Sequence, residues 1–347
     1  MAETDGGEGP ERTPVAAREI AANLELRRLW GPIAGLALGL VLLVLAARGV
    51  DLHAVGQAIE HADPLWVAAG VLAVLLTIAA QAGRWRRLFG ESSSPRYRSL
   101  ARAVLVGKLV TAVLPAQVGE VARFYVLSRD EGASKVTLMG SIGAEKLFDL
   151  LFLVLAAGLT AAVATVPAEL TGSLAGAAGL GAALFVAAVA LPHQWVRTAA
   201  EELGIRLGES VAARLTGVVE RGLAGLESLR RPRLAAAACA WSALIWELGA
   251  GTNVALFWAF GLPFGVGAAL LVLTLINAGS IPPSSPAGLG VFHALTIFGL
   301  QAVGAEQSSG IDRAAALAYA TPLHAVVYGP RIVLGALALA LRPGGKK

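Results

Sequence analysis

Eight charged residues stand within stretches of sequence that are otherwise strongly apolar, and they are the first candidates for chemistry. A charged side chain costs about 2.5 to 3.5 kcal/mol at the centre of an isolated membrane helix. We therefore expect these side chains to pair with one another, to face water or to bind a charged ligand. The basic members are Lys108, Arg123, Lys146 and Arg331, and the acidic members are Glu120, Glu145, Asp149 and Glu247.

The spacing of these charges predicts two compact groups. Glu120 and Arg123 are three positions apart and share one face of a helix. Glu145 and Asp149 are four positions apart, and Lys146 stands three before Asp149. A cation is therefore expected beside two carboxylates.

Two interpretations of the charges stay open. In the first, they are structural ion pairs that fix the register of the helices. In the second, the four basic residues bind an anionic head group, and the four acidic residues are their ion-pair partners or proton carriers. Arginine suits this second role because its planar guanidinium binds two phosphate oxygens, while lysine adds a point charge.

Other polar residues of the apolar stretches predict the lining of an internal cavity. His324, Tyr328 and Arg331 follow one another at steps of four and three, which places them on one helix face. A hydrogen-bonded packing role explains such a histidine equally well. Asn277 precedes a Pro-rich segment and His293 follows it. The predicted lining residues are Pro115, Gly119, Ser141, Asn277, Ser284, Ser285, Pro286, Gly288, His293, His324 and Tyr328.

The composition indicates that these residues belong to a membrane protein. Of the 347 residues, 56% are hydrophobic and 15% are charged, whereas roughly a quarter of a soluble domain is charged. The pI of 9.5 does not indicate nucleic-acid binding, because the basic residues gather in short loops between apolar stretches. The single cysteine, Cys239, excludes a disulfide framework or a cysteine metal site. We expect no metal and no cofactor.

Apolar stretches of about 20 residues predict an all-α polytopic membrane protein. Two further stretches, 100–127 and 266–303, are broken by Leu114-Pro115-Ala116 and by a Pro-rich segment at 282–288. Each is expected to be a re-entrant helix pair, since non-helical backbone at membrane depth is tolerated only inside protein or beside a water-filled cavity. The uninterrupted spans are predicted at 32–47, 64–83, 136–165, 174–191, 234–258 and 314–341.

The distribution of Lys and Arg predicts the orientation of these spans. Seven basic residues lie between positions 84 and 108, against one between 48 and 62. By the positive-inside rule, both termini are then cytoplasmic and the protein is a multi-pass protein of the cell membrane. The segment Gly83–Leu88, with three arginines and a tryptophan, is interpreted as an anchor at the inner interface.

The two halves of the chain share one layout of two spans, a Pro-broken pair and a long helix, in opposite orientations. Inverted repeats with interrupted segments at matching positions are typical of transporters with a site near the membrane midplane. The alternative is that both breaks are ordinary kinks or loops. The predicted parts are a disordered or interfacial tail at 1–30, a first repeat at 31–165, a second repeat at 166–341 that includes a cytoplasmic amphipathic segment at 193–233, and a basic tail at 342–347.

Three motifs resemble the lysylphosphatidylglycerol synthase transmembrane, flippase-like family. They are Leu114 to Arg123, Ser141 through Glu145 and Lys146 to Asp149, and Pro283 to Phe292. The similarity runs through about residues 31–341, with departures at Gln117, where members often have Arg or a small residue, and at His293, where they often have Glu.

The resemblance implies translocation of a lipid head group. Relatives include the flippase half of the multiple peptide resistance factor, which moves aminoacylated phosphatidylglycerol between leaflets, and proteins proposed to act on polyprenyl-phosphate sugars. The transferase domain of the full-length synthase is not found, so we do not expect this chain to make lysylphosphatidylglycerol.

Three functional hypotheses follow. The leading one is a flippase or scramblase that carries an anionic lipid head group, from an aminoacyl phospholipid or a polyprenyl-phosphate glycolipid, through an internal polar cavity. The sequence contains no phosphate loop for ATP hydrolysis, no His-Glu-x-x-His and no Gly-x-Ser-x-Gly. The second is a transferase that modifies a lipid within the bilayer, with Glu120, Glu145 or Asp149 as base. The third is a non-catalytic scaffold for a separate lipid synthase. The expected partners are membrane lipids and, in the third case, that synthase, but no nucleic acid.

Overall fold

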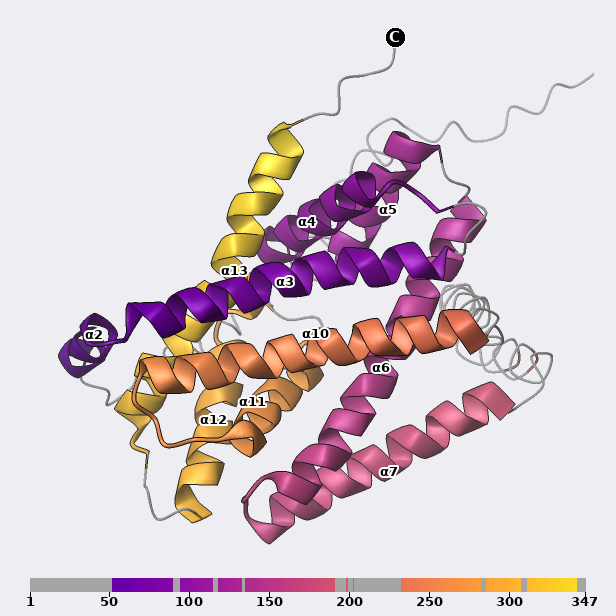
Figure 1. Cartoon of the computed structure of the whole chain (residues 1–347). Helices are drawn as coiled ribbons and strands as arrows, with labels where there is room; N and C mark the ends of the chain where they lie inside the picture. The colour runs from indigo at the N-terminus through magenta and orange to yellow at the C-terminus, as the bar shows by residue number, and fades with distance from the viewer. Residues whose placement is uncertain are drawn as a thin grey trace, which may run out of the picture.

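The computed structural model describes residues 52–89, 94–114, 118–132, 135–190, 198, 202, 232–281, 285–306 and 311–341. In these ranges every regular element is a helix (Figure 1), which confirms the predicted all-α class. The α-helices are α2 (Leu52–Glu60), α3 (Pro64–Leu88), α4 (Tyr97–Val113), α5 (Gly119–Glu131), α6 (Lys135–Val163), α7 (Ala168–Ala190), α10 (Pro232–Ala259), α11 (Val266–Gly279), α12 (Val291–Glu306) and α13 (Arg313–Ala340), with a short 3₁₀ turn η1 (Pro286–Gly288) before α12.

Five segments among the described residues are long and apolar enough to cross a membrane. They are Pro64–Leu88, Thr137–Val163, Pro232–Ala259, Pro286–Ala305 and Arg313–Ala340. The chain is therefore a multi-pass membrane protein.

Local sequence explains where several of these helices begin and end. Asp63 caps α3, because its side chain accepts a hydrogen bond from the Leu65 backbone N–H at 2.8 Å, and a proline follows at the first helical position. Asp312 caps α13 in the same way, at 2.6 Å from the Ala315 nitrogen. Helix α13 also contains Pro322 and Pro330 in its interior.

Both predicted interruptions are present. Helix α4 ends at Val113 and α5 begins at Gly119, while α11 ends at Gly279 and α12 begins at Val291. In the second break the backbone of Ala287 is left-handed, with φ 52°, a conformation that non-glycine residues rarely adopt. Whether the pairs are re-entrant stays a prediction.

Two helix boundaries differ most from the prediction. The second span was predicted to end at Gly83, but α3 continues to Leu88, so the whole segment interpreted as an interfacial anchor is helical. Helix α7 begins at Ala168 rather than at 174. Ser173 fits within the helix because its side-chain hydroxyl donates a hydrogen bond to the Glu169 backbone carbonyl at 2.8 Å. The predicted span at 32–47, the two tails and nearly all of the amphipathic segment at 193–233 lie outside the described residues.

Helices α3 and α10 lie side by side along most of their length (Figure 1). A Cβ on Gly70 would lie 3.6 Å from Leu256, and one on Gly83 would lie 2.9 Å from the Trp241 ring. Because the residue numbers run in opposite directions, the two helices are antiparallel. Glycine at position 83 is required for this close approach.

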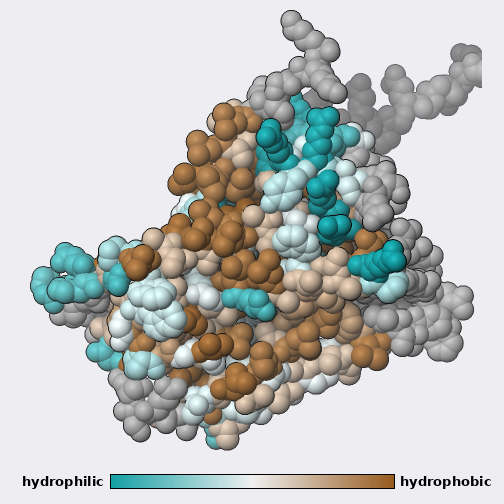
Figure 2. Space-filling view, viewed as in Figure 1, coloured by the Kyte–Doolittle hydropathy of each residue, from teal (hydrophilic) through white to brown (hydrophobic). Residues whose placement is uncertain are grey.

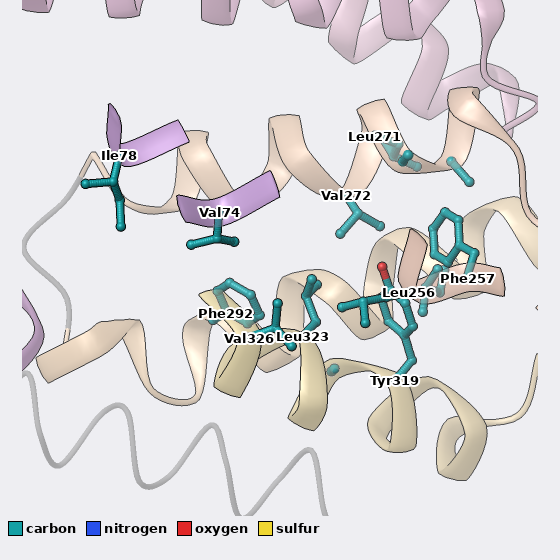
Figure 3. Packing of buried hydrophobic residues seen from close by; sticks show 14 of the residues in the cluster. Val74, Ile78, Leu256, Phe257, Leu271, Val272, Phe292, Tyr319, Leu323 and Val326 are labelled. Carbon is teal, nitrogen blue, oxygen red and sulfur yellow. The ribbon is translucent and has the colours of Figure 1, made fainter. Parts of the chain in front are cut away.

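The apolar core lies between α3, α10, α11, α12 and α13 (Figure 3). Tyr319 of α13 is fully buried there, and its hydroxyl donates to Asn253 Oδ1 of α10 at 2.9 Å. Its ring stacks on Phe257 with centroids 5.0 Å apart. On the face shown in Figure 2, hydrophilic side chains gather over α4 and α5 and around α2, and hydrophobic residues lie between them. This pattern fits a band in contact with lipid.

Candidate functional site

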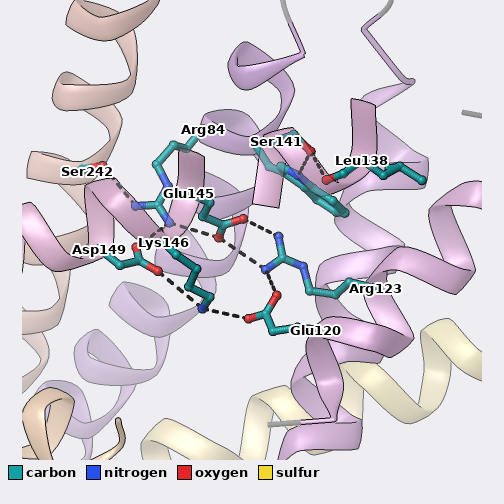
Figure 4. A network of polar contacts seen from close by, with 10 residues as sticks. Arg84, Glu120, Arg123, Leu138, Ser141, Glu145, Lys146, Asp149 and Ser242 are labelled. Atoms are coloured by element: carbon teal, nitrogen blue, oxygen red, sulfur yellow. Dashed lines mark hydrogen bonds and ion pairs between the residues drawn. The ribbon is translucent and has the colours of Figure 1, made fainter. Parts of the chain in front are cut away.

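Arg84 of α3 reaches between two carboxylates of α6 (Figure 4). Its Nη2 lies 3.0 Å from Glu145 Oε1 and 2.7 Å from Asp149 Oδ1. Its Nη1 donates to Ser242 Oγ of α10 at 3.1 Å. Since the side chain is only 2% exposed, one buried arginine joins α3, α6 and α10.

Arg123 of α5 binds the same glutamate from the other side. Its Nη2 lies 2.7 Å from Glu145 Oε2, and its Nη1 lies 3.0 Å from Glu120 Oε2. Lys146 Nζ lies 2.9 Å from Glu120 Oε1 and 3.7 Å from Asp149 Oδ2, so the lysine bridges these two carboxylates. The predicted pairs Glu120–Arg123 and Lys146–Asp149 are therefore present.

These contacts close into a ring in which cations and carboxylates alternate. Each of the three carboxylates bridges two cations, and each cation bridges two carboxylates (Figure 4). The ring carries three positive and three negative charges, so it is neutral by itself. We name these six residues the charge ring: Arg84, Glu145, Arg123, Glu120, Lys146 and Asp149.

An aromatic side chain holds Arg123 in place. The guanidinium carbon of Arg123 lies 4.2 Å from the centre of the Trp85 ring, a cation–π distance. Trp85 Nε1 donates to Ser141 Oγ at 3.1 Å, and Ser141 in turn donates to the Leu138 carbonyl at 2.9 Å. The structure does not bring Ser141 to the cavity wall, as the prediction had it. This serine is 4% exposed and positions the tryptophan.

Two glycines let α5 approach α4 closely enough to place Arg123. A Cβ on Gly107 would overlap the Arg123 side chain, and one on Gly119 would overlap Thr111 and the Gly107 carbonyl. The turn at Gly119 is therefore in backbone contact with α4, and only glycine fits at the two positions.

A cavity of about 540 Å³ lies beside the charge ring. Its lining combines charged, neutral polar and apolar residues. The charged residues are Lys108, Glu120, Arg123, Lys146, Asp149 and Arg331. The apolar residues include Leu150 and Leu153 of α6, Ile245 and Trp246 of α10, and Leu273 and Ile276 of α11.

The structure places many of the predicted residues at this cavity, though their roles stay predictions. Besides the six charged residues, the predicted residues that line it are Gly119, Asn277, Ser285, Gly288 and Tyr328. Pro286, His293 and His324 are not in the lining, while Pro115 and Ser284 lie outside the described residues. Glu247 is exposed on α10 and takes part in none of the ion pairs of the described chain.

His324 packs behind the cavity wall instead of facing it. Its ring stacks on Tyr328 with centroids 4.6 Å apart, and its Nε2 donates to the Ala287 carbonyl at 3.0 Å. The His293 ring lies 5.0 Å away. The two histidines therefore tie the second helix break to α13, which agrees with the packing role left open for them.

Lys108 of α4 and Arg331 of α13 differ from the other cations at the cavity. Neither takes part in an ion pair within the described part of the chain. The Arg331 guanidinium carbon lies 5.5 Å from the Tyr328 ring centre. They are thus the two cations of the lining that no carboxylate neutralises.

Arg84, Trp85 and Ser242 were missed as site residues. Arg84 and Trp85 were assigned to the interfacial anchor, since three arginines at a helix end are typical of that role. One signal was present: Thr77, Gln81 and Arg84 follow at steps of four and three, so a polar stripe runs along one face of α3. Metal ligands give no further candidate, because no cluster of three His, Cys, Asp or Glu occurs among the described residues.

A family profile described as "Lysylphosphatidylglycerol synthase TM region" matches residues 33–335, which is most of the chain. The chain belongs to this family. The three motifs that carry the resemblance meet at the site. The first supplies Glu120 and Arg123, the second supplies the α6 members of the charge ring, and the third supplies Ser285 and Gly288 of the cavity lining.

Among curated proteins, Glycosyltransferase AglD of Haloferax volcanii is similar to this chain. It is 26% identical over 339 residues, which cover 87% of this chain and 53% of AglD. The chain thus spans about half the length of that relative. No solved structure matches the chain.

Proposed function

We propose that the protein is a lipid flippase or scramblase that binds the anionic head group of a membrane lipid in the cavity and carries it between leaflets. The observation that carries the proposal is a cavity whose lining combines charged with apolar residues. A lipid likewise combines a charged head group with apolar chains. In this proposal the head group contacts Lys108, Arg123 and Arg331, and the chains contact Leu153, Trp246 and their neighbours.

Family membership supports a role in lipid handling, because the family takes its name from the membrane region of a phospholipid-modifying enzyme. The charge ring supports a site at membrane depth. Charges inside a membrane protein are costly and commonly mark substrate or ion pathways. The proposal includes a cell-membrane location with both termini in the cytoplasm, supported by the distribution of Lys and Arg.

We further propose that the two halves are inverted repeats. Helices α3 and α10 hold corresponding places in the two predicted repeats, and they pack side by side in opposite directions. The two broken pairs also correspond, and residues of both line the cavity, Gly119 from the first and Ser285 from the second. Both facts are expected of a site between inverted repeats.

Filling the cavity tests the proposed function without disturbing the charge ring. Leu153 lines the cavity, whereas Leu155, on the same helix, is 54% exposed. In liposomes containing the purified protein, wild type and Leu155→Trp should move a fluorescent anionic lipid between leaflets. Leu153→Trp should lose most of this movement, because the larger ring occupies the space proposed for the lipid chains. Absence of movement for every anionic lipid tested, or full activity of folded Leu153→Trp, would contradict the proposal.

A second candidate is a lipid-modifying transferase, which the name of the relative AglD favours. The charge ring gives it little support. Both Glu145 oxygens accept hydrogen bonds from arginines, so this carboxylate cannot take a proton without breaking an ion pair. Mass spectrometry of lipids from cells with and without the protein would reveal the altered lipid that this alternative requires.

A further inference from the structure

The charges around the cavity do not balance. The charge ring is neutral, and Lys108 and Arg331 add two positive charges that no described carboxylate compensates. We propose that Lys108 and Arg331 form an anion subsite of their own, which selects a lipid head group carrying two negative charges, such as a terminal phosphate monoester. This inference rests on the proposed function and names the substrate class of the same cavity.

The packing of α4 against α13 brings the two cations close together along the helices. Arg102 Nε of α4 donates to the Ala338 carbonyl of α13 at 2.9 Å. Nearly one turn earlier in α13, a Cβ on Gly335 would lie 2.6 Å from Leu109 Cβ and 2.7 Å from the Leu105 carbonyl of α4. The helices therefore run antiparallel in close contact. Lys108 directly precedes Leu109, and Arg331 stands one turn before Gly335, so the two cations lie within about one helical turn of each other along the helix pair, and both side chains line the cavity.

Arg331 also has unused hydrogen-bonding capacity. Among the residues that the structure describes, its Nε is buried without a hydrogen-bond partner, and none of its guanidinium nitrogens is in an ion pair. Arg84 and Arg123 likewise have an unpartnered Nε, but their Nη atoms bind carboxylates of the charge ring. A buried guanidinium at the wall of a cavity, with no carboxylate beside it, is a site for an anion.

The chemistry of the pair favours one class of head group. Arginine binds two oxygens of one phosphate through its planar fork, and lysine supplies a point charge to a third oxygen. A phosphate monoester offers three terminal oxygens and nearly two negative charges. A phosphodiester offers two free oxygens and one charge. An aminoacylated phospholipid adds an ammonium group, which the two cations repel.

Two amphiphiles that differ in one methyl group test this selectivity. Dodecyl phosphate is a monoester, which becomes mainly a dianion above its second pKa of about 6. Dodecyl methyl phosphate stays a monoanion. The full chain in phosphatidylcholine nanodiscs should bind the monoester about tenfold more tightly at pH 8, a difference of about 1.4 kcal/mol. Because the chain has seven tryptophans, binding is reported by the fluorescence change that is lost in Trp246→Phe, a residue of the cavity lining. At pH 5 the preference should vanish, because both probes then carry one charge.

Two variants test whether Lys108 and Arg331 cause the tighter binding of the monoester. Lys108→Gln and Arg331→Gln should each reduce the tenfold difference in affinity to about twofold or less, since each removes one of the two positive charges. Arg129→Gln is the control, because Arg129 is exposed on α5, and it should keep the tenfold difference in affinity. Where a variant does not fold, the comparison of wild type at pH 8 and pH 5 still tests whether the cavity prefers a dianion.

The outcomes separate the two proposals. Equal binding of both phosphates at pH 8 would overturn the dianion subsite and leave the head-group cavity standing. Tighter binding of dodecylamine would overturn both proposals, because the cavity would then select a cation. Binding of no probe at all would overturn the proposed function together with the subsite.

Discussion

Arg84 and Glu145 are 61 positions apart in the chain, yet Arg84 Nη2 lies 3.0 Å from Glu145 Oε1 and both side chains are at most 5% exposed. This contact joins α3 to α6. Arg123 approaches the same carboxylate from α5, so one glutamate links three helices. The arrangement of the helices around the cavity depends on this buried pair.

Removing Arg84 should therefore destabilise the protein strongly. In Arg84→Gln, Glu145 and Asp149 each lose a cation, and Glu145 stays in a poorly solvated place with its side chain 5% exposed. Loss of one partner of a buried pair costs about 3 to 5 kcal/mol. The free energy of unfolding in mixed detergent micelles measures this cost. Arg87→Gln is the matched control, because Arg87 is an exposed arginine on the same helix and its replacement should change stability little. A small effect of Arg84→Gln would show that the ring does not hold α3 against α6.

The contact between α4 and α5 should tolerate no side chain at position 119. Gly119→Ala places a methyl group against the Gly107 carbonyl and Thr111, and overpacking of this kind costs about 1 to 3 kcal/mol. Thermal unfolding should show the loss, and lipid movement should fall as Arg123 shifts. Gly176→Ala on α7 is the control, since nothing lies within 4 Å of its Cβ position. Equal behaviour of the two variants would mean that α5 is not fixed by this approach.

Ser141→Ala should weaken the site through Trp85. The substitution leaves the buried Trp85 N–H without an acceptor, which costs about 1 to 3 kcal/mol, and frees the ring that covers Arg123. Ser173→Ala, on the exposed face of α7, should be nearly neutral. Trp85→Phe keeps an aromatic face but needs no acceptor. It should therefore recover part of the stability when combined with Ser141→Ala, and failure of that rescue would contradict the assigned role of the serine.

Tyr319→Phe should separate stability from function. It removes the hydrogen bond to Asn253 and should lower the free energy of unfolding by about 0.5 to 1.5 kcal/mol. Lipid movement per folded molecule should not change, because Tyr319 lies outside the cavity lining. Tyr125→Phe, at a position 65% exposed, is the control for loss of a hydroxyl. A drop in transport without a drop in stability would place Tyr319 in the translocation path.

Replacement of Glu247 tests whether a carboxylate outside the charge ring contributes to lipid movement. Glu247 was predicted as a partner of the cavity cations, but it is exposed on α10. Glu247→Gln should leave both lipid movement and stability close to wild type, whereas Glu120→Gln should reduce lipid movement by leaving Lys146 and Arg123 with fewer partners. A loss of transport in Glu247→Gln would restore the role that the sequence suggested for it.

Much of the fold was predictable because hydropathy and proline act locally. Helix α10 was predicted at 234–258 and runs Pro232–Ala259. Five of the six members of the charge ring were also found, since a charge in an apolar helix is rare and costly. What could not be predicted is the partner of each charge. The closing contacts of the ring join α6 to α3 and to α5, and no local pattern contains that information.

Arg84 shows the limit most clearly. Three arginines follow Gly83, and the positive-inside rule explains all three equally well. Only the packing of α3 against α10 and α6 decides that Arg84 is buried while Arg86 and Arg87 are exposed. The prediction that Ser141 lines the cavity was wrong for a different reason. Its place in the second motif indicated that it is important, but only the contact with Trp85 shows that it positions another side chain.

The two prolines inside α13 have a mechanical consequence. Pro322 and Pro330 each lack the N–H that would bond to the carbonyl four residues earlier. The helix therefore has two points, about 12 Å apart along its axis, at which it can bend without giving up a backbone hydrogen bond. Arg331 directly follows the second point. A change in the curvature of α13 would change the gap between Arg331 and Lys108, so the width of the proposed anion subsite would depend on the backbone as well as on side-chain rotation.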